Sequence, residues 1–464
     1  MVENALIKMI QEGYNLPEEY FSTLINKATD IENILYVTQL EQLTDDRFEK
    51  FYVDTSKIRE NNVINSINIE LKNTLRINSK ITFAGFTGSG KTTELTKLAK
   101  KLENDYNIIF FSIIKRLNSN SITIESFLFE IIEDVLNLIS INNYFDEDNN
   151  IKEIVNNINN WFNETINVTE KDKIRNASLS VGIEFLKKIC GGAKLEYNVN
   201  KSEKQITTCI EERKIKDLIY ECNKIFDYLK EKTGKRNLII VDDLEKFDFF
   251  KVRDFYTKNS AFIKEFKTSM ILTIPIELVF HSDYSLIENV FGKAKVLPMI
   301  KVKDKNNNEF TDGINVLKEI ISKRIDLSLF ENECFIDAIK HSGGSLRELF
   351  NIINDAVIRE MGESSSNKIT KKSIEKSITQ NKDYFSMKIF ERNDEVKITF
   401  DQYLDVLIDI YNGNKKEPNQ NIALLDLLRI RAVMKYNGEG FYDIHPLLDD
   451  FVKSHKEKRE NARK

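Results

Sequence analysis

The sequence predicts an α/β fold in which a parallel sheet is flanked by helices, followed by a helical lid and a small C-terminal module. Strand-like runs alternate with helical ones over the first two thirds of the chain, as in sheets covered on both faces. A predicted buried strand at 80–84 leads directly into a glycine-rich loop and then a helix. A second apolar run, 238–241, ends in two aspartates. After these strands the chain becomes almost entirely helical.

The length of 464 residues exceeds that of one ordinary domain, so we expect several parts. A polar helical segment occupies 1–50. The sheet-containing core follows at 51–302 and carries a long helical insertion at about 120–210. A helical lid is expected at 303–365. The remaining residues, 366–464, form the C-terminal module.

Composition excludes several classes of function. The net charge of −5 shows that the chain as a whole is not a polycation, so any DNA binding must come from a local patch. No run of about 18 apolar residues predicts a membrane-spanning helix. The first residues lack the basic start and apolar stretch of a signal peptide. The four cysteines form no Cys-x-x-Cys pair. We therefore expect a cytoplasmic protein with no membrane contact.

The glycine-rich loop matches the pattern Gly-x-x-x-x-Gly-Lys-Thr between a strand and a helix. Its glycines permit positive φ angles and let backbone amides approach phosphate oxygens closely. The following helix adds partial positive charge. Lys91 is expected to reach the β- and γ-phosphates and Thr92 to ligate Mg²⁺. The pattern predicts a P-loop NTPase fold, with nucleotide-binding residues Gly85, Phe86, Thr87, Gly88, Ser89, Gly90, Lys91, Thr92 and Thr93.

The second apolar run supplies the acidic half of the predicted site. A strand that is apolar throughout is buried on both faces and belongs to the centre of a sheet. Its carboxyl end is where open α/β sheets bind ligands. Asp242 is expected to hold Mg²⁺ through water, and Asp243 to orient or deprotonate the attacking water. Glu245 is the alternative base.

Polar residues further along suggest how the nucleotide is sensed. Thr273, at the end of the next predicted strand, is a candidate contact for the γ-phosphate. Arg347 lies on the first turn of a lid helix, where its planar five-donor group suits a phosphate. Arg324 is a weaker candidate for an arginine finger acting on a neighbouring subunit.

The order of these elements resembles that of AAA+ and STAND-type ATPases over about residues 51–365. Residues 242–246, Asp-Asp-Leu-Glu-Lys, are similar to the acidic strand of STAND and KAP-type proteins. The helix start at 343–347, Gly-Gly-Ser-Leu-Arg, is similar to the second sensor of origin-recognition-type proteins. Ile58-Arg59-Glu60 is similar to an Arg-Glu pair that those proteins place near the adenine. The resemblance implies ATP as the nucleotide, with Arg59 among the residues that bind it.

Two features depart from this resemblance. The helical insertion between the second and third strands is large. Asp243 stands where AAA+ motors favour glutamate, so we expect slow turnover.

The C-terminal module has the pattern of a winged helix. Strand-like runs at 431–434 and 441–444 flank Asn437-Gly438-Glu439-Gly440, a good turn sequence. The basic tail at 455–464 either contacts DNA phosphates or is a solvated terminus.

Two functions are consistent with these features. The first is an ATP-hydrolysing switch that couples nucleotide state to homo-oligomerisation or to activation of a partner protein. By analogy, such a switch belongs to bacterial stress or phage (antiviral) defence. The alternative is an origin-recognition-like ATPase that binds DNA through the C-terminal module. A small-molecule kinase is disfavoured, because it needs no helical lid or extra module.

Overall fold

The computed structural model of the protein describes residues 26–40, 43, 45–59, 62–73, 78–117, 122–142, 144, 148–168, 212–363, 367–393, 396–416, 421–436 and 440–462. These residues divide into two compact units. One contains the described parts of Met1–Val63, Gly85–Thr96 and Val296–Lys464. The other contains those of Ile64–Ala84 and Lys97–Lys295. Among the described residues, no helix has both the length and the apolarity needed to cross a bilayer. The four-part division expected from the sequence stays a prediction.

The sheet has five strands in the order β2-β3-β4-β1-β5. The pairs β2–β3, β3–β4 and β4–β1 are all parallel, which confirms the predicted parallel sheet. The strands are β1 Lys80–Gly85, β2 Tyr106–Ser112, β3 Arg236–Asp242, β4 Ser269–Ile274 and β5 Lys295–Leu297.

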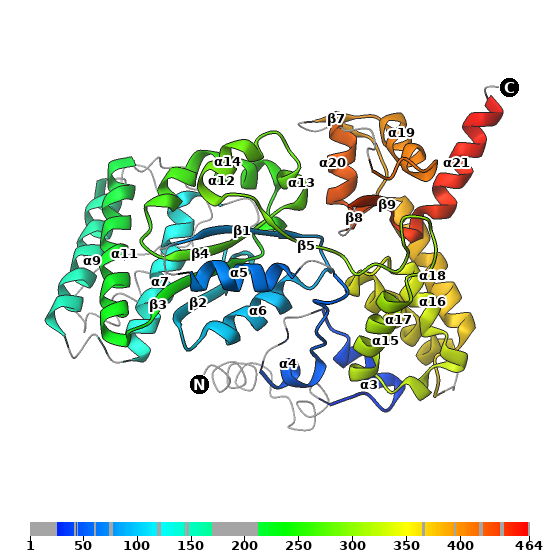
Figure 1. Ribbon diagram of the computed structural model, residues 1–464, viewed down its shortest axis with the longest axis horizontal. Coiled ribbons are helices and arrows are strands. Elements are labelled where there is room, and N and C mark those ends of the chain that lie inside the picture. The colour runs from blue at the N-terminus through cyan, green and yellow to red at the C-terminus, as the bar shows by residue number, and fades with distance from the viewer. Residues whose placement is uncertain are drawn as a thin grey trace. The chain divides into compact units, whose positions relative to one another are not determined.

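The central strands are buried because both of their faces are covered by helices. Every residue of β1 and β4 is buried, and Leu238, Ile239, Ile240 and Val241 of β3 are fully inaccessible. In the view of Figure 1, α12 and α14 lie on one side of the strands and α5 on the other. Continuous apolar runs, rather than alternating ones, are what strands buried on both faces require.

In the unit that contains most of the sheet, the helices alternate with the strands. α7 and α11 pack against β2, and α9 packs beside α11 (Figure 1). α7 begins at a capping box in which Thr123 and Ser126 bond each other's backbone amides. The helices and 3₁₀ turns are α5 Val63–Lys72, α6 Lys91–Leu102, η1 Ile113–Lys115, α7 Ile124–Ile141, α9 Asn149–Val168, α11 Glu212–Thr233, η2 Leu244–Lys246, α12 Phe249–Glu265, α13 Ile276–Val279 and α14 Tyr284–Phe291. The part of the expected insertion at 169–211 lies outside the described residues.

A buried lysine closes the amino end of β1. The ammonium of Lys80 donates to the carbonyls of Phe266 (2.9 Å) and Thr268 (2.6 Å), and burial lowers its pKa from 10.5 to about 7. At pH values between about 7 and 10.5, Lys80 holds a proton in the unfolded chain but not in the folded chain. Raising the pH therefore favours the folded state there, by up to about 1.4 kcal/mol per pH unit, and the effect ends below about pH 7.

We accordingly expect Lys80→Met to flatten the rise of unfolding free energy with pH. The measurement is urea unfolding followed by circular dichroism, at several pH values from 7 to 9.5, on the wild type and the variant. Subtracting the unfolding free energy of the variant from that of the wild type at each pH cancels the contribution of every other titrating group. Parallel pH profiles for the two proteins would contradict the expectation.

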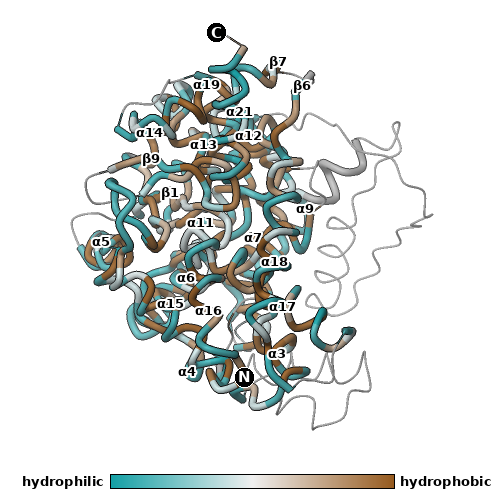
Figure 2. Tube along the Cα trace, turned by 90° about the vertical axis from the view of Figure 1, so that its right-hand side faces the viewer, coloured by the Kyte–Doolittle hydropathy of each residue, from teal (hydrophilic) through white to brown (hydrophobic). Residues whose placement is uncertain are grey.

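The other unit is mainly helical. α17 and α18 pack together, and α17 also packs against α3. Hydrophilic and hydrophobic residues alternate along these helices, as amphipathic helices require (Figure 2). They are α3 Ile31–Val37, α4 Asp45–Phe51, α15 Thr311–Arg324, η3 Leu327–Leu329, η4 Glu331–Glu333, α16 Phe335–His341, α17 Leu346–Glu363 and α18 Lys371–Ser386.

The C-terminal part of this unit contains two short hairpins among helices. The β8–β9 hairpin is antiparallel, pairing Val433 with Ile444 and Tyr436 with Phe441. Its first strand begins two residues later than expected, because Arg431 takes a left-handed φ of 64°. The elements are β6 Arg392–Asn393, β7 Lys397–Ile398, α19 Phe400–Tyr411, α20 Ile422–Arg429, β8 Val433–Tyr436, β9 Phe441–Ile444, η5 Pro446–Leu448 and α21 Asp449–Ala462.

The basic tail is helical through Ala462 rather than irregular. Its Arg459 pairs with Asp401 (2.5 Å) and Asp405 (2.7 Å), so this guanidinium is already satisfied by carboxylates of α19. The order of helices followed by a hairpin is compatible with a winged helix, which stays a prediction. The hairpin tip at 437–439 lies outside the described residues.

Candidate functional site

The glycine-rich loop connects β1 to α6 and contains two residues that need glycine. Gly88 and Gly90 have φ angles of 86° and 91°, in the left-handed region that side chains disfavour. A Cβ added at Gly85 would lie 3.0 Å from the carbonyl oxygen of Leu297 and 3.0 Å from the Ser89 hydroxyl. No side chain fits at Gly85 without displacing the Leu297 carbonyl or the Ser89 hydroxyl, so this position favours glycine as well.

Lys91 and Ser89 bring polar groups to the interior of the loop. The Lys91 ammonium donates to the carbonyl of Gly85 at 2.9 Å and approaches that of Phe86 at 3.4 Å. The Ser89 hydroxyl oxygen is buried and makes no hydrogen bond with any described residue. A buried hydroxyl without a partner costs free energy unless a ligand or water satisfies it. Both groups fit a phosphate bound in this loop.

Arg59 supports the loop from the segment before α5. Its guanidinium donates to the carbonyl oxygen of Ser89 at 2.6 Å and to that of Pro298, and its Nε donates to the Thr55 hydroxyl at 2.7 Å. Burial lowers the pKa of Arg59 to about 10, and the nearby Glu94 carboxylate partly opposes this. The structure thus gives Arg59 a role in holding the loop, whereas binding near adenine stays a prediction.

The start of α17 lies against the same loop. The amide of Leu346 donates to the carbonyl of Gly88 at 3.1 Å. A Cβ added at Gly88 would come within 2.4 Å of the Ser345 hydroxyl and 3.0 Å of the Arg347 Cβ. The loop and Arg347, more than 250 residues apart in the chain, are therefore neighbours within one unit. The sensing role of Arg347 stays a prediction.

Arg324 does not fit its expected role as an arginine finger. Arg324 is 7% exposed, and its guanidinium carbon lies 5.2 Å from the ring centroid of Phe51 and 5.3 Å from that of Phe350. Burial lowers its pKa to about 9. Phe51 is the last residue of α4. A finger must reach a neighbouring subunit, and a side chain enclosed in this way cannot.

In the other unit, the end of β3 gathers three carboxylates. One oxygen each of Asp242, Asp243 and Glu245 lie within 4.8 Å of one another. Asp242 is 1% exposed and Asp243 6% exposed. Buried carboxylates are costly unless paired or bound to a metal. Oxygen ligands at this spacing are the kind that Mg²⁺ prefers, so this group fits the predicted metal site.

Asp243 is held in an unusual conformation. Its φ of 68° is left-handed. The Ser112 hydroxyl donates to one of its carboxylate oxygens at 2.5 Å, and the Lys246 ammonium lies 2.7 Å from the other. Its own amide donates to Asp242 at 2.8 Å. Both oxygens of Asp243 thus have partners, and action as a base requires one of these contacts to open. Whether Asp243 or Glu245 serves as base stays open.

Thr273 lies inside β4 and is inaccessible to solvent. Its hydroxyl oxygen accepts a hydrogen bond from the amide of Leu244 at 3.0 Å, and its carbonyl accepts one from Tyr256 at 2.7 Å. Thr273 therefore fixes the turn that carries the carboxylates. Its contact with a γ-phosphate stays a prediction.

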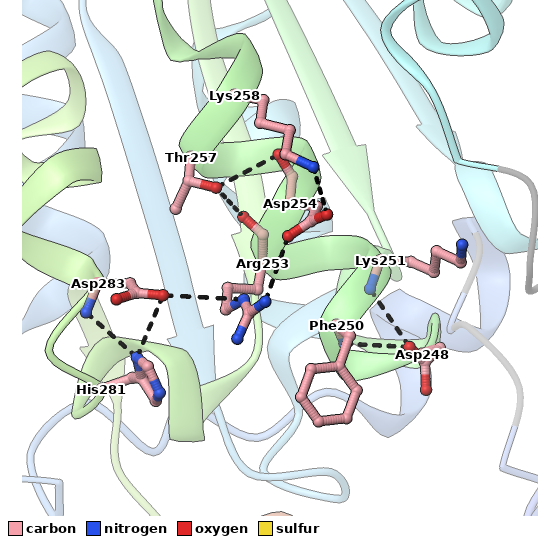
Figure 3. A network of polar contacts seen from close by, with 9 residues as sticks. All are labelled: Asp248, Phe250, Lys251, Arg253, Asp254, Thr257, Lys258, His281 and Asp283. Atoms are coloured by element: carbon pink, nitrogen blue, oxygen red, sulfur yellow. Dashed lines mark hydrogen bonds and ion pairs between the residues drawn. The ribbon is translucent and has the colours of Figure 1, made fainter. Parts of the chain in front are cut away.

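A polar network secures α12, the helix that follows the carboxylate turn (Figure 3). Asp248 caps it by accepting from the amides of Phe250 (3.0 Å) and Lys251 (3.2 Å). Further along, the Arg253 guanidinium lies 3.7 Å from Asp283, in the segment before α14. The carboxylate turn is therefore followed by a helix that is fixed at its start and along its side.

Sequence reasoning missed several residues around the two halves of the site. Ser112 ends β2 directly beside Asp242 in the sheet register, and a polar residue directly after the apolar residues 108–111 was a signal for it. The buried Glu94 follows Lys91 by three residues, and Tyr52 approaches it at 3.4 Å. The motif at 343–347 includes Ser345 but gave it no role, and no local pattern pointed to Tyr52, because their contacts join distant parts of the chain.

Comparison with known proteins gives only distant likenesses. No family model matches the chain, and no curated protein matches it. Among solved structures, Cdc6p from Pyrobaculum aerophilum is similar at 12% identity and a TM-score of 0.35, covering 88% of this chain and 99% of that one. The Aeropyrum pernix ORC2 protein, in ADPNP–ADP complexes, is similar at 12% identity and 0.38, covering 88% and 98%. The Aeropyrum pernix ORC1 protein, in complex with DNA, is similar at 9% and 0.36, covering 89% and 97%.

None of these three is a STAND-type or defence protein by its description. Identities and TM-scores this low assign the chain to no family. The case for a function therefore rests on the residues of the two units.

Proposed function

We propose that the protein binds ATP with Mg²⁺ and hydrolyses it slowly. The observation that supports this most is the loop itself: Gly88 and Gly90 have left-handed φ angles, the Lys91 ammonium donates to the carbonyl of Gly85, and the buried Ser89 hydroxyl has no hydrogen-bond partner among the described residues. Such loops bind phosphate through backbone amides and a lysine. In this proposal Thr92 and Asp242 hold Mg²⁺, which supplies charge neutralisation when bound, and Thr93 continues the loop into α6.

The second half of the proposal concerns hydrolysis. β1, β4 and β3 are parallel, so their carboxyl ends meet at one edge of the sheet. β1 ends at Gly85, where the loop begins, and β3 ends at Asp242. Asp243 or Glu245 would orient the attacking water, Thr273 would support them, and Arg347 would report the state of the nucleotide. The pairing of Asp243 with Ser112 and Lys246 supports slow turnover.

The test uses the full chain. We expect ATP to bind with higher affinity than GTP in calorimetric titrations, and labelled phosphate to be released from ATP only when Mg²⁺ is present. Chelating Mg²⁺ should stop release. Absence of nucleotide binding at millimolar concentrations would refute the proposal.

The biological role admits two candidates. A switch that changes its assembly or activates a partner is supported by the contact of the loop with the start of α17, which gives the nucleotide a route to the helical part. An origin-recognition-like role on DNA is supported by the α19, α20 and β8–β9 order. Against DNA stands the pairing of Arg459 with Asp401 and Asp405. STAND-type signalling and antiviral defence have no support beyond the sequence resemblance.

One solution measurement separates these candidates. The mass of the protein with ATP or ADP, with and without duplex DNA, is measured at several salt concentrations. DNA binding that weakens steeply with salt favours the origin-recognition-like role. A nucleotide-dependent change in mass without DNA binding favours the switch.

A further inference from the structure

The turn Gly343–Ser345, just before α17, has close backbone contacts on two sides. Gly343 and Gly344 have φ angles of 61° and 85°, so both positions favour glycine. A Cβ added at Gly344 would lie 1.7 Å from the carbonyl oxygen of Ile300. Since no side chain fits there, the turn is pressed against the segment that follows β5. On its other end, through Leu346 and Ser345, it touches Gly88 of the phosphate loop.

The β8–β9 hairpin contacts the same turn. The Tyr436 hydroxyl donates to the carbonyl of Gly343 at 2.8 Å. A Cβ added at Gly343 would come within 2.6 Å of the Met434 methyl and 3.0 Å of Pro446. Tyr436 is almost fully buried, and burial raises the pKa of its phenol, which therefore remains a donor. The hairpin thus fixes the position of the turn through a buried hydrogen bond.

An ion pair makes a second connection between the hairpin region and the start of α17. Arg431, which directly precedes the hairpin, places its guanidinium 2.9 Å from Glu348 on the first turn of α17. Glu348 is 2% exposed, and its other oxygen accepts a hydrogen bond from the Ser345 hydroxyl. Removing one partner of a buried charge pair leaves the other charge uncompensated. Arg431 therefore controls Ser345, the residue that lies against Gly88.

We propose that Tyr436 and Arg431 are positioning residues of the phosphate loop, holding the Gly343–Ser345 turn against Gly88 and coupling the loop to the β8–β9 hairpin. This inference rests on the proposed function, because it concerns the same nucleotide site. Tyr436 and Arg431 each act through the turn, and Arg347, two residues beyond Ser345, moves with it. Since coupling between two sites is reciprocal, nucleotide in the loop also stabilises the hairpin.

The test compares Tyr436→Phe and Arg431→Met with matched controls in the same module. Tyr403→Phe removes an equally buried hydroxyl, bonded to Asp426 at 2.7 Å, and Arg429→Met removes an arginine paired with that same aspartate at 2.8 Å. Among the described residues, the side chains of both control positions bond Asp426 and not the turn. ATP and ADP dissociation constants and the thermal midpoint are measured for all five proteins.

We expect each test variant to change the ratio of ATP to ADP affinity by about fivefold or more, and each control to change it by less than about twofold. Loss of thermal stability alone, with an unchanged ratio in both test variants, would overturn the inference. If Arg431→Met does not fold, Tyr436→Phe decides alone, since it removes a single hydroxyl.

Hydrogen exchange provides the reciprocal measurement. In the wild type, ATP is expected to slow amide exchange in the peptide spanning 430–446 by about threefold or more, and this slowing is expected to be lost in Tyr436→Phe. Equal exchange in that peptide with and without bound ATP would contradict the coupling. A wild type that binds no nucleotide refutes the proposed function as well. If the wild type binds ATP normally and Lys91→Ala abolishes this binding, the nucleotide site stands. If Tyr436→Phe and Arg431→Met then leave the ratio of ATP to ADP affinity unchanged, only the coupling is refuted.

Discussion

Lys91→Ala is expected to weaken ATP binding by about 100-fold or more and to remove measurable turnover. In the structure Lys91 is 6% exposed, and its ammonium donates to the carbonyls of Gly85 and Phe86 inside the loop. A charge-assisted hydrogen bond to phosphate is lost with the side chain, and no described residue of the loop supplies another cation. The loss of one such buried contact corresponds to about 2–5 kcal/mol, which covers the expected factor.

The matched control is Lys101→Ala. Lys101 lies in the last turn of the same helix, α6, and is exposed. It should leave ATP affinity and turnover unchanged, while both variants keep the wild-type circular dichroism spectrum. Turnover by Lys91→Ala at the wild-type rate would show that the loop is not the nucleotide site.

The phosphate loop and the strand that ends at Asp242 were predictable because their sequence patterns are local. Gly85 to Thr92 is a contiguous pattern whose glycines meet a conformational need, and Gly88 and Gly90 have the positive φ angles expected of them. The run ending at Asp242 is apolar throughout because its strand is buried in the sheet, which is a short-range consequence of burial. The structure agrees with both, and with the parallel sheet.

The contacts that join distant segments were not predictable. Nothing near Gly88 indicates that Leu346 and Ser345 lie against it, because this contact depends on how α15 to α17 fold back. The same holds for Arg324: at the end of α15 it has the sequence features of an exposed arginine, and only the rings of Phe51 and Phe350 show that it is buried.

The conformation of Asp243 also depends on contacts that the sequence could not predict. Sequence alone allowed an aspartate in a turn, and aspartate tolerates left-handed φ better than most residues. That Ser112 and Lys246 bind its two oxygens depends on the register of β2 with β3 and on the short helix η2. The register is a consequence of packing the whole sheet, so the interpretation of Asp243 as a ready base could not be tested before the structure.

Asp242→Asn is expected to reduce ATP hydrolysis by about 100-fold or more while ATP affinity changes by less than about tenfold. The physical reason is that asparagine keeps the shape of the side chain and the oxygen that accepts from the Asp243 amide at 2.8 Å, and so preserves the turn. What it loses is the negative charge, in a group of carboxylates whose oxygens lie within 4.8 Å. Binding and hydrolysis are therefore separated, in contrast to Lys91→Ala.

The control for this substitution is Asp248→Asn, the same chemical change six residues further on. Asp248 caps α12, and asparagine is an equally good cap, so neither stability nor hydrolysis should change. The two variants are compared by phosphate release over a range of Mg²⁺ concentrations and by ATP titration. If Asp242→Asn hydrolyses ATP normally, then Asp242 does not hold Mg²⁺ and the carboxylate group at the end of β3 serves the fold. If instead it loses ATP binding entirely, the charge of Asp242 is needed for binding, and the expected separation of binding from hydrolysis is contradicted. Only retained ATP binding with lost turnover supports a role of the Asp242 carboxylate in hydrolysis.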